Sequence, residues 1–165
     1  MDFLNSKDFY YKIALITVII VFIEIVLGSY VEGIDAGMSC PQWPLCYGQL
    51  IPLNSSHFYS YTATQVWSEY VHRIVASLVS ILLVFEAYLT YIHKNEITAN
   101  QVPIGKNRFN IMIIILILLV LQVILGALTV LSNTDPLIVS SHLAVGTLIF
   151  GGTIYLYTKI SPQKG

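Results

Sequence analysis

Four long apolar runs constrain this chain more than any other feature of its sequence. Each is close to the roughly 20 residues that a helix needs to cross the hydrocarbon core of a bilayer. Backbone groups in lipid must be paired internally, which leaves helices and closed barrels, and these continuous runs lack the alternation of barrel strands. We therefore predict an all-α membrane protein, a four-transmembrane-helix bundle in which residues 1–165 form a single domain. The expected helices cover Ile13–Tyr30, Val71–Ile92, Ile111–Leu131 and Leu137–Tyr157.

The composition agrees with this prediction and excludes one class of partner. Of the 165 residues, 56% are hydrophobic and only 10% are charged, whereas charged residues make up about 25% of an ordinary soluble domain. The net charge is −1, and no basic patch typical of nucleic-acid binding is present. We therefore expect membrane lipid, and no nucleic acid, as a partner.

Lysine and arginine residues predict how the chain is oriented. Seven of the eight precede the first run, follow the last, or lie between the second and third: Lys7, Lys12, Lys94, Lys106, Arg108, Lys159 and Lys164. Because such residues concentrate on the cytoplasmic side, we predict a multi-pass protein of the cell membrane with both termini in the cytoplasm. The loop 31–70 and the turn 132–136 then face outward. Arg73 is the exception, which predicts a local partner such as Glu69, one turn before it.

Two histidines lie near the outward ends of their helices. His72 opens the second run, after a capping box at Thr62–Gln65 that predicts an earlier helix start. His142 lies about one and a half turns into the fourth helix, after an Asp135 cap and Pro136 at the first helical position. The two imidazoles are therefore expected at matching depth.

Paired imidazoles at one depth predict the two axial ligands of a haem. One turn deeper than each histidine is a small residue, Ala76 or Gly146, which would leave a gap beside a flat macrocycle. A histidine in a membrane helix can also be a hydrogen-bonded structural residue or part of a proton relay, and these readings stay open. Two further histidines without such a counterpart are expected to be solvated: His57 and His93.

A short repeat links the first and third runs. Glu24 precedes Gly28 by four residues, and Gln122 precedes Gly126 by the same spacing. We predict a pair of pseudo-symmetric helical hairpins, which would bring the two histidines face to face. An acid within lipid is a functional candidate by default, but the counterpart Gln122 favours an ordinary hydrogen-bonded contact between helices for Glu24.

The outward loop contains both cysteines of the chain, Cys40 and Cys46. Outside the membrane, in an oxidising compartment, they can form a disulfide. A small, exposed disulfide is the labile kind that takes part in redox exchange, although on the residues alone a purely structural link is favoured. The role of Glu69 is also left open between chemistry and structure, because it can act in the reaction or simply pair with Arg73.

Segments from the whole chain resemble the haem A synthase family. They are Gly-Met-Ser-Cys-Pro-Gln-Trp-Pro-Leu-Cys-Tyr-Gly-Gln at 37–49, Glu-Tyr-Val-His-Arg at 69–73, Gln-Val-Ile-Leu-Gly-Ala-Leu-Thr-Val at 122–130 and Ser-His-Leu at 141–143. The family oxidises the ring-D methyl group of haem O to a formyl group, giving haem A for terminal oxidases. This chain departs from the pattern at Glu32, where a basic residue is expected. It also has four predicted helices and one histidine pair where most members have eight and two, and so is similar to the compact archaeal form.

The resemblance implies roles for the residues already described. His72 and His142 would be the axial ligands of the haem iron, and Arg73 could pair with a haem propionate. The catalytic residues would be the acid and a redox-active cysteine pair: Glu69, Cys40 and Cys46. The implied cofactor is a resident haem b, with haem O as substrate and haem A as product. Haem O synthase and a terminal oxidase are the implied protein partners.

A chain with a single histidine pair also suggests a homo-oligomer, in which identical subunits supply a second haem site. Helix faces with Gly28 and Gly126 would supply the close contacts between subunits.

Two other functions stay open on the residues alone. A b-type cytochrome that carries electrons would use the same histidine pair without substrate chemistry. A membrane thiol–disulfide oxidoreductase would use the outward cysteines, but it leaves both histidines unexplained.

Overall fold

The computed structural model describes residues 6–53, 60–93 and 104–160, and within these ranges the regular elements are helices, without a strand. They are α1 (Lys7–Gly33), α2 (Ala63–Ile92), α3 (Ile104–Leu131) and α4 (Pro136–Ile160). Each helix is long and apolar enough to cross a membrane. The predicted all-α class with four membrane-spanning helices is therefore confirmed.

Polar caps set where two of the helices begin. At α2 the Thr62 side chain accepts from the N–H of Gln65, and the Gln65 side chain accepts from the N–H of Thr62, so the predicted capping box is present. At α4, Oδ1 of Asp135 accepts from the N–H of Leu137 at 2.9 Å, and Pro136 is the first helical residue. Both predicted helix starts are confirmed. Because α1 ends at Gly33 and α2 begins at Ala63, the outward loop is shorter than the predicted 31–70.

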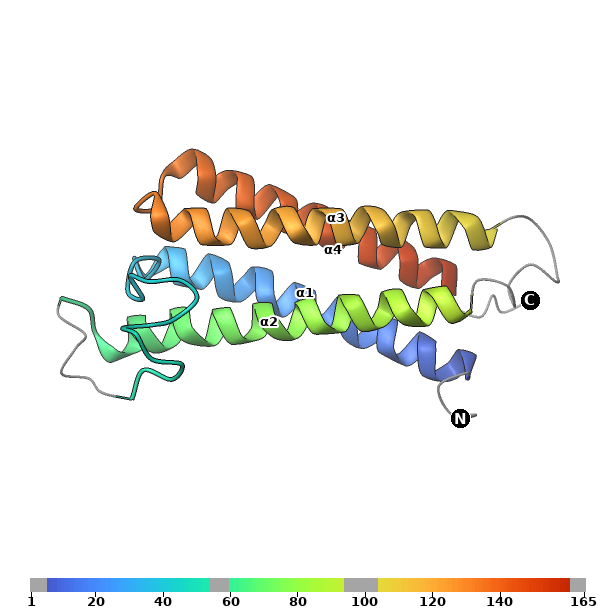
Figure 1. The fold of residues 1–165 in the computed structure, drawn as a ribbon, viewed down its shortest axis with the longest axis horizontal. Helices are drawn as coiled ribbons and strands as arrows, with labels where there is room; N and C mark the ends of the chain where they lie inside the picture. The colour runs from blue at the N-terminus through green and yellow to red at the C-terminus, as the bar shows by residue number, and fades with distance from the viewer. Residues whose placement is uncertain (1–5, 54–59, 94–103, 161–165) are drawn as a thin grey trace.

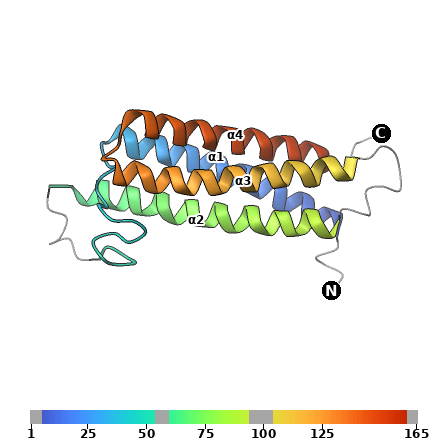
Figure 2. The same cartoon turned by 45° about the horizontal axis from the view of Figure 1, so that its top comes forward.

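The helices run alternately up and down and form a ring. Helix α1 packs against α2, α3 packs against α4, and the ring is closed by contacts of α4 with α1 and of α2 with α3. The loop after α1 and the turn between α3 and α4 lie at one end of the bundle (Figures 1 and 2). Helix α1 begins and α4 ends at the opposite end. The connections are thus grouped as predicted, and the placement of the termini in the cytoplasm stays a prediction.

An apolar core fills the middle of the ring. Its buried members come from all four helices: Val21, Val79, Leu83, Met112, Ile115, Leu119, Val145, Ile149 and Leu156. Large apolar side chains also cover the outside of the helices, as Ile81, Ile117 and Leu148 show with exposed fractions of 66%, 63% and 60%. An apolar exterior of this kind is what lipid-facing helices require.

His93, at the end of α2, corrects one prediction. Its side chain is only 1% exposed, so the expectation of a solvated histidine was wrong. The ring stacks on Tyr10 of α1 at a centroid distance of 5.3 Å, and Nδ1 lies 2.8 Å from the carbonyl oxygen of Leu89. The predicted solvation of His57 lies outside the described residues.

Glu86 is a second acid inside the bundle, nearer to the same end as His93. Its side chain is completely buried, and neither carboxyl oxygen has a hydrogen-bond partner in the described part of the chain. Thr17 of α1 lies beside it, but the Thr17 hydroxyl donates to the carbonyl oxygen of Ile13 at 3.0 Å. Among the described residues, the carboxyl group is therefore buried without a hydrogen bond to offset the loss of water.

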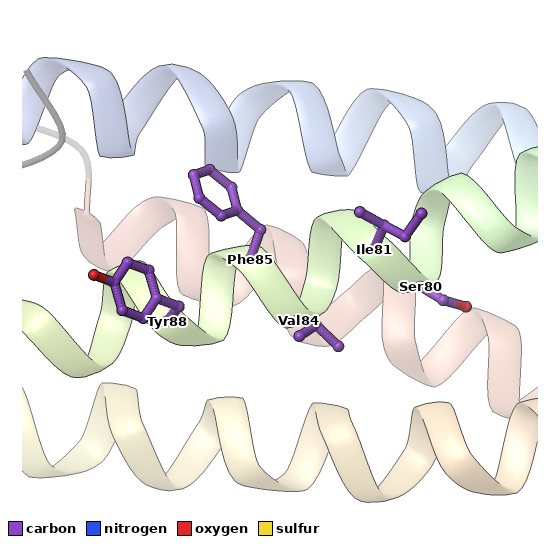
Figure 3. A pocket seen from close by; sticks show the side chains of 5 residues that line it. All are labelled: Ser80, Ile81, Val84, Phe85 and Tyr88. Atoms are coloured by element: carbon purple, nitrogen blue, oxygen red, sulfur yellow. The ribbon is translucent and has the colours of Figure 1, made fainter.

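A shallow open hollow lies on α2 and is lined from this helix alone, by Ser80, Ile81, Val84, Phe85 and Tyr88 (Figure 3). It begins about two helical turns from His72 along α2. The hollow is therefore separate from the histidines.

Candidate functional site

His72 of α2 packs against one polar residue and one glycine of α1. Its Nδ1 lies 2.8 Å from Oε1 of Glu24, although the two atoms are not aligned as a hydrogen bond. One turn further along α1, a Cβ atom on Gly28 would lie 3.1 Å from Cε1 of the His72 ring. A side chain at Gly28 would therefore push the imidazole away.

His142 of α4 packs against α3 in the same way. Its Nε2 lies 3.3 Å from Nε2 of Gln122, and a Cβ on Gly126 would lie 3.1 Å from Cε1 of the ring. The gap expected beside His142 at Gly146 is filled by the Gln122 amide, because a Cβ there would lie 3.0 Å from Nε2 of Gln122.

The two hairpins therefore repeat one arrangement, in which a polar residue and the glycine four positions later hold a histidine of the next helix. These matched contacts support the predicted pseudo-symmetry. The sequence interpretation missed that Glu24 and Gln122 contact the histidines, since it assigned them only to packing between helices. The repeat itself was the signal that could have identified them.

Several buried polar atoms around the histidines lack hydrogen-bond partners within the described residues. They are Oε2 of Glu24, Nδ1 of His72, Oε1 of Gln122 and Nδ1 of His142. Unpaired buried polar groups are uncommon in native proteins and call for an explanation such as an additional ligand. The two imidazoles come from different helices, and each has a ring nitrogen without a hydrogen-bond partner in the part of the chain that the structure describes. A pair of imidazoles with unused ring nitrogens is the donor set of a bis-histidine haem, so the residues present fit this group.

Glu69 and Arg73 lie on the same part of α2 but bind the outward loop. Oε2 of Glu69 accepts from the N–H of Cys40 at 2.6 Å and from the hydroxyl of Ser39 at 2.9 Å. Oε1 pairs with the Arg73 guanidinium, which confirms the predicted partner of Arg73. Glu69 is only 3% exposed, so this ion pair is largely desolvated.

The Arg73 guanidinium also fixes the loop backbone. It donates to the carbonyl oxygens of Cys40 at 2.7 Å, Gln42 at 2.6 Å and Leu45 at 3.1 Å. These bonds explain why a cation can remain at this end of the bundle. We call Glu69 and Arg73 the loop anchor.

Cys40 and Cys46 form a disulfide within this loop. The expectation that it would be exposed was wrong, because Cys40 is 0% and Cys46 is 2% exposed. Residues of the loop and of the first turns of α2 pack around it: Tyr47, Tyr61, Val66 and Tyr70.

The predicted site residues therefore form two groups that meet on α2. The first is the disulfide with the loop anchor, and the second is the histidine pair with Glu24 and Gln122. Adjacent positions on one turn belong to different groups, since His72 faces α1 while Arg73 holds the loop. No contact joins the loop anchor to either imidazole among the described residues.

Comparison with known proteins gives a consistent result. The model of the COX15-CtaA family, described as cytochrome oxidase assembly protein, matches residues 11–164. A protein named heme A synthase from Shewanella oneidensis is 27% identical over 159 residues, covering 90% of this chain and 45% of that protein. Heme A synthases from Staphylococcus aureus strains MSSA476 and JH9 are 32% and 31% identical over 139 residues, covering 83% of this chain and 40% of each relative. The chain thus spans less than half the length of these relatives.

Proposed function

The chain belongs to the COX15-CtaA family of cytochrome oxidase assembly proteins, and on this premise we propose that it is a haem A synthase. The proposed reaction oxidises the ring-D methyl group of haem O to a formyl group. The observation that carries the proposal is the pair His72 and His142, each held by a glycine and a polar side chain of the preceding helix. The names of the relatives support the same activity.

His72 and His142 would hold a haem through their imidazole nitrogens, with haem b as the resident cofactor and haem O as the substrate. The bound haem supplies the redox chemistry of the reaction. The protein supplies the ligands, the apolar surroundings and the positions of nearby polar groups. Arg73 would contribute to cofactor binding through the loop that it fixes beside the histidine pair.

Glu69 would be the acid that moves a proton during methyl oxidation. Its carboxyl group is buried and bonded to Cys40, Ser39 and Arg73, so it would act from a fixed position inside the loop anchor. Glu69→Gln should retain haem but stop conversion of haem O. Arg73→Gln is the matched control, because it weakens the same anchor and keeps the acid. If both variants lose conversion to the same extent, Glu69 serves only to hold the loop.

Cys40 and Cys46 would cycle between disulfide and dithiol, with the disulfide taking two electrons and two protons from a thiol reductant. Both are buried, so this exchange requires the loop to open. Burial argues against the alternative of a general thiol–disulfide oxidoreductase, whose disulfide must reach protein partners.

The central test is haem typing of the purified protein after co-expression with a source of haem O. Haem A should accumulate with the wild type and with His57→Ala, the control that removes a histidine not proposed as a ligand. It should be absent with His72→Ala and His142→Ala. A protein that binds haem b through both histidines but never yields haem A would be a b-type cytochrome instead.

The homo-oligomer also remains a proposal, as do haem O synthase and a terminal oxidase as partners. Gly28 and Gly126 cannot supply its contacts as expected, because both pack against histidines of the same chain. Cross-linking in membranes and native mass measurement in mild detergent test the assembly. A fully active monomer under both conditions would remove it.

A further inference from the structure

We propose that the two histidines are not equivalent ligands: Glu24 makes His72 the firmer one, and Gln122 makes His142 the exchangeable one. The bond to His142 would therefore form last when a haem binds and break first when it leaves. This inference rests on the proposed function, because it concerns how that function's haem site loads and releases its ligand.

His72 has the partner that a lasting metal ligand normally has. A histidine bound to a metal usually directs its other ring N–H to a carboxylate or carbonyl oxygen, which orients the ring and strengthens the bond to the metal. Oε1 of Glu24 is 2.8 Å from Nδ1 of His72, which is hydrogen-bond distance, although the two are not aligned as a hydrogen bond here. A small rotation of either side chain would make this bond and leave Nε2 for the iron. Glu24 also has a second, unpaired oxygen, Oε2, available to the same N–H.

His142 has no carboxylate in the described part of the chain. Its Nε2 is 3.3 Å from the Gln122 amide nitrogen, and its Nδ1 is buried without a hydrogen-bond partner. If Nε2 binds iron, the Gln122 contact is lost and the N–H at Nδ1 has no acceptor. If Nδ1 binds iron, Nε2 carries the proton and faces the Gln122 NH2 group, which is also a donor. Turning the amide over would offer its oxygen, but this neutral acceptor is weaker than a carboxylate. In either case His142 is held less firmly than His72.

The difference is built into equivalent positions. Glu24 comes four residues before Gly28, and Gln122 comes four residues before Gly126. Each of these glycines packs against a histidine. In both sites, a Cβ atom added to the glycine would lie 3.1 Å from Cε1 of the histidine ring. The two glycines therefore hold their rings at the same distance. An acid in one hairpin and an amide in the other is therefore the difference in chemistry between otherwise matched sites.

Exchange of a ligand is needed when the one histidine pair serves the substrate haem as well as the resident haem b, because the modified haem must then be released. Two equally firm imidazoles would retain the product, whereas one firm and one exchangeable imidazole keep the macrocycle positioned while a coordination position opens. The Gln122 amide also occupies the space beside Gly146, so this side chain has to move when His142 changes partner.

The test uses the full-length protein in detergent, reconstituted with haem b. Absorption and resonance Raman spectra give the coordination state, and transfer to excess apomyoglobin gives the rate of haem loss. His142→Ala should retain a five-coordinate, high-spin haem that binds carbon monoxide, whereas His72→Ala should lose its haem. The isosteric variant Glu24→Gln should speed haem loss by roughly 10–100-fold, the range found for partners of metal-bound histidines. Gln122→Glu should slow haem loss.

The doubly exchanged variant E24Q/Q122E is the matched control, because it keeps side-chain shape and total charge. In this background the roles should reverse, so that His72→Ala retains haem and His142→Ala loses it. Equal haem loss from both single histidine variants, with no reversal on exchange, overturns the inference but leaves bis-histidine binding intact. If neither histidine variant changes the spectrum or the rate of haem loss, the proposed haem site itself is wrong.

Discussion

Glu69→Gln should release the cysteine loop from α2. In the native protein Oε2 of Glu69 accepts from Cys40 and Ser39, while Oε1 pairs with Arg73. Glutamine has one acceptor oxygen and one NH2 donor. Whichever way the amide is turned, the NH2 group faces a donor, so either Arg73 or the pair of loop donors loses its acceptor.

The size of the effect follows from these contacts. Removing one partner of a buried ion pair costs about 3–5 kcal/mol, and a hydrogen bond to a charged group contributes about 1.5–3 kcal/mol. Glutamine keeps some of these bonds and the Arg73 side chain is 15% exposed, so we expect about 3 kcal/mol, at the lower end of the first range. Since each 1.4 kcal/mol is a factor of ten, the closed loop should become about 100-fold less favoured.

Disulfide reduction measures this equilibrium directly. Cys40 is 0% and Cys46 is 2% exposed, so a thiol reductant reaches the disulfide only after the loop opens. The reduction rate, followed by maleimide labelling of the new thiols, should rise about 100-fold in Glu69→Gln when opening precedes reduction. Ser39→Ala removes a hydroxyl whose single hydrogen is shared between Glu69 and the carbonyl oxygen of Gln65. It should raise the rate only about tenfold, as expected for roughly 1.5 kcal/mol, the lower end of the range for such bonds. An unchanged rate in Glu69→Gln would refute the assignment of Glu69 to the loop anchor.

Three further predictions concern other parts of the molecule. Gly126→Ala places a Cβ 3.1 Å from the histidine ring and should weaken haem b binding in a spectral titration, whereas Gly151→Ala, with nothing within 4 Å, should not. Cys40→Ser and Cys46→Ser should each slow haem A formation while haem content stays normal, and loss of the protein instead would indicate a structural disulfide. Glu86→Leu removes a buried carboxyl group without hydrogen bonds to the described residues and should stabilise the protein by about 1–3 kcal/mol. The melting temperature in detergent should rise, and a lower melting temperature would show that the carboxyl group has a partner.

The sequence was most informative where local chemistry decides the structure. The need to pair backbone groups in lipid leaves few alternatives for runs of this length, so the four helices could be predicted. The starts of α2 and α4 could be predicted because a cap involves residues only two or three positions apart. The partnership of Glu69 and Arg73 has the same local origin, since the two residues are four apart on one helix.

Contacts between distant segments were beyond this reasoning. The burial of Cys40 depends on how the loop folds back on Val66, and that of His93 depends on Tyr10 of another helix. Helical periodicity gives the direction of Glu24 relative to its own helix, but not which neighbouring helix supplies its partner. The repeat around Gly28 and Gly126 was visible in the sequence, whereas its use in holding histidines required the packing of α1 on α2 and of α3 on α4.

The turn of α2 that contains Glu69, His72 and Arg73 joins the two groups of the site. Glu69 and Arg73 hold the loop, and His72, between them in sequence, faces Glu24 of α1. A shift of the backbone of this turn moves all three side chains together, so we expect the loop and the position of His72 to be coupled. Coupling between two sites is reciprocal. If the closed loop favours haem binding at His72, bound haem must favour the closed loop by the same factor. An open loop would then bind haem more weakly. Loss of the disulfide alone leaves the loop anchor in place, so the two serine variants should keep the loop closed and their haem content normal.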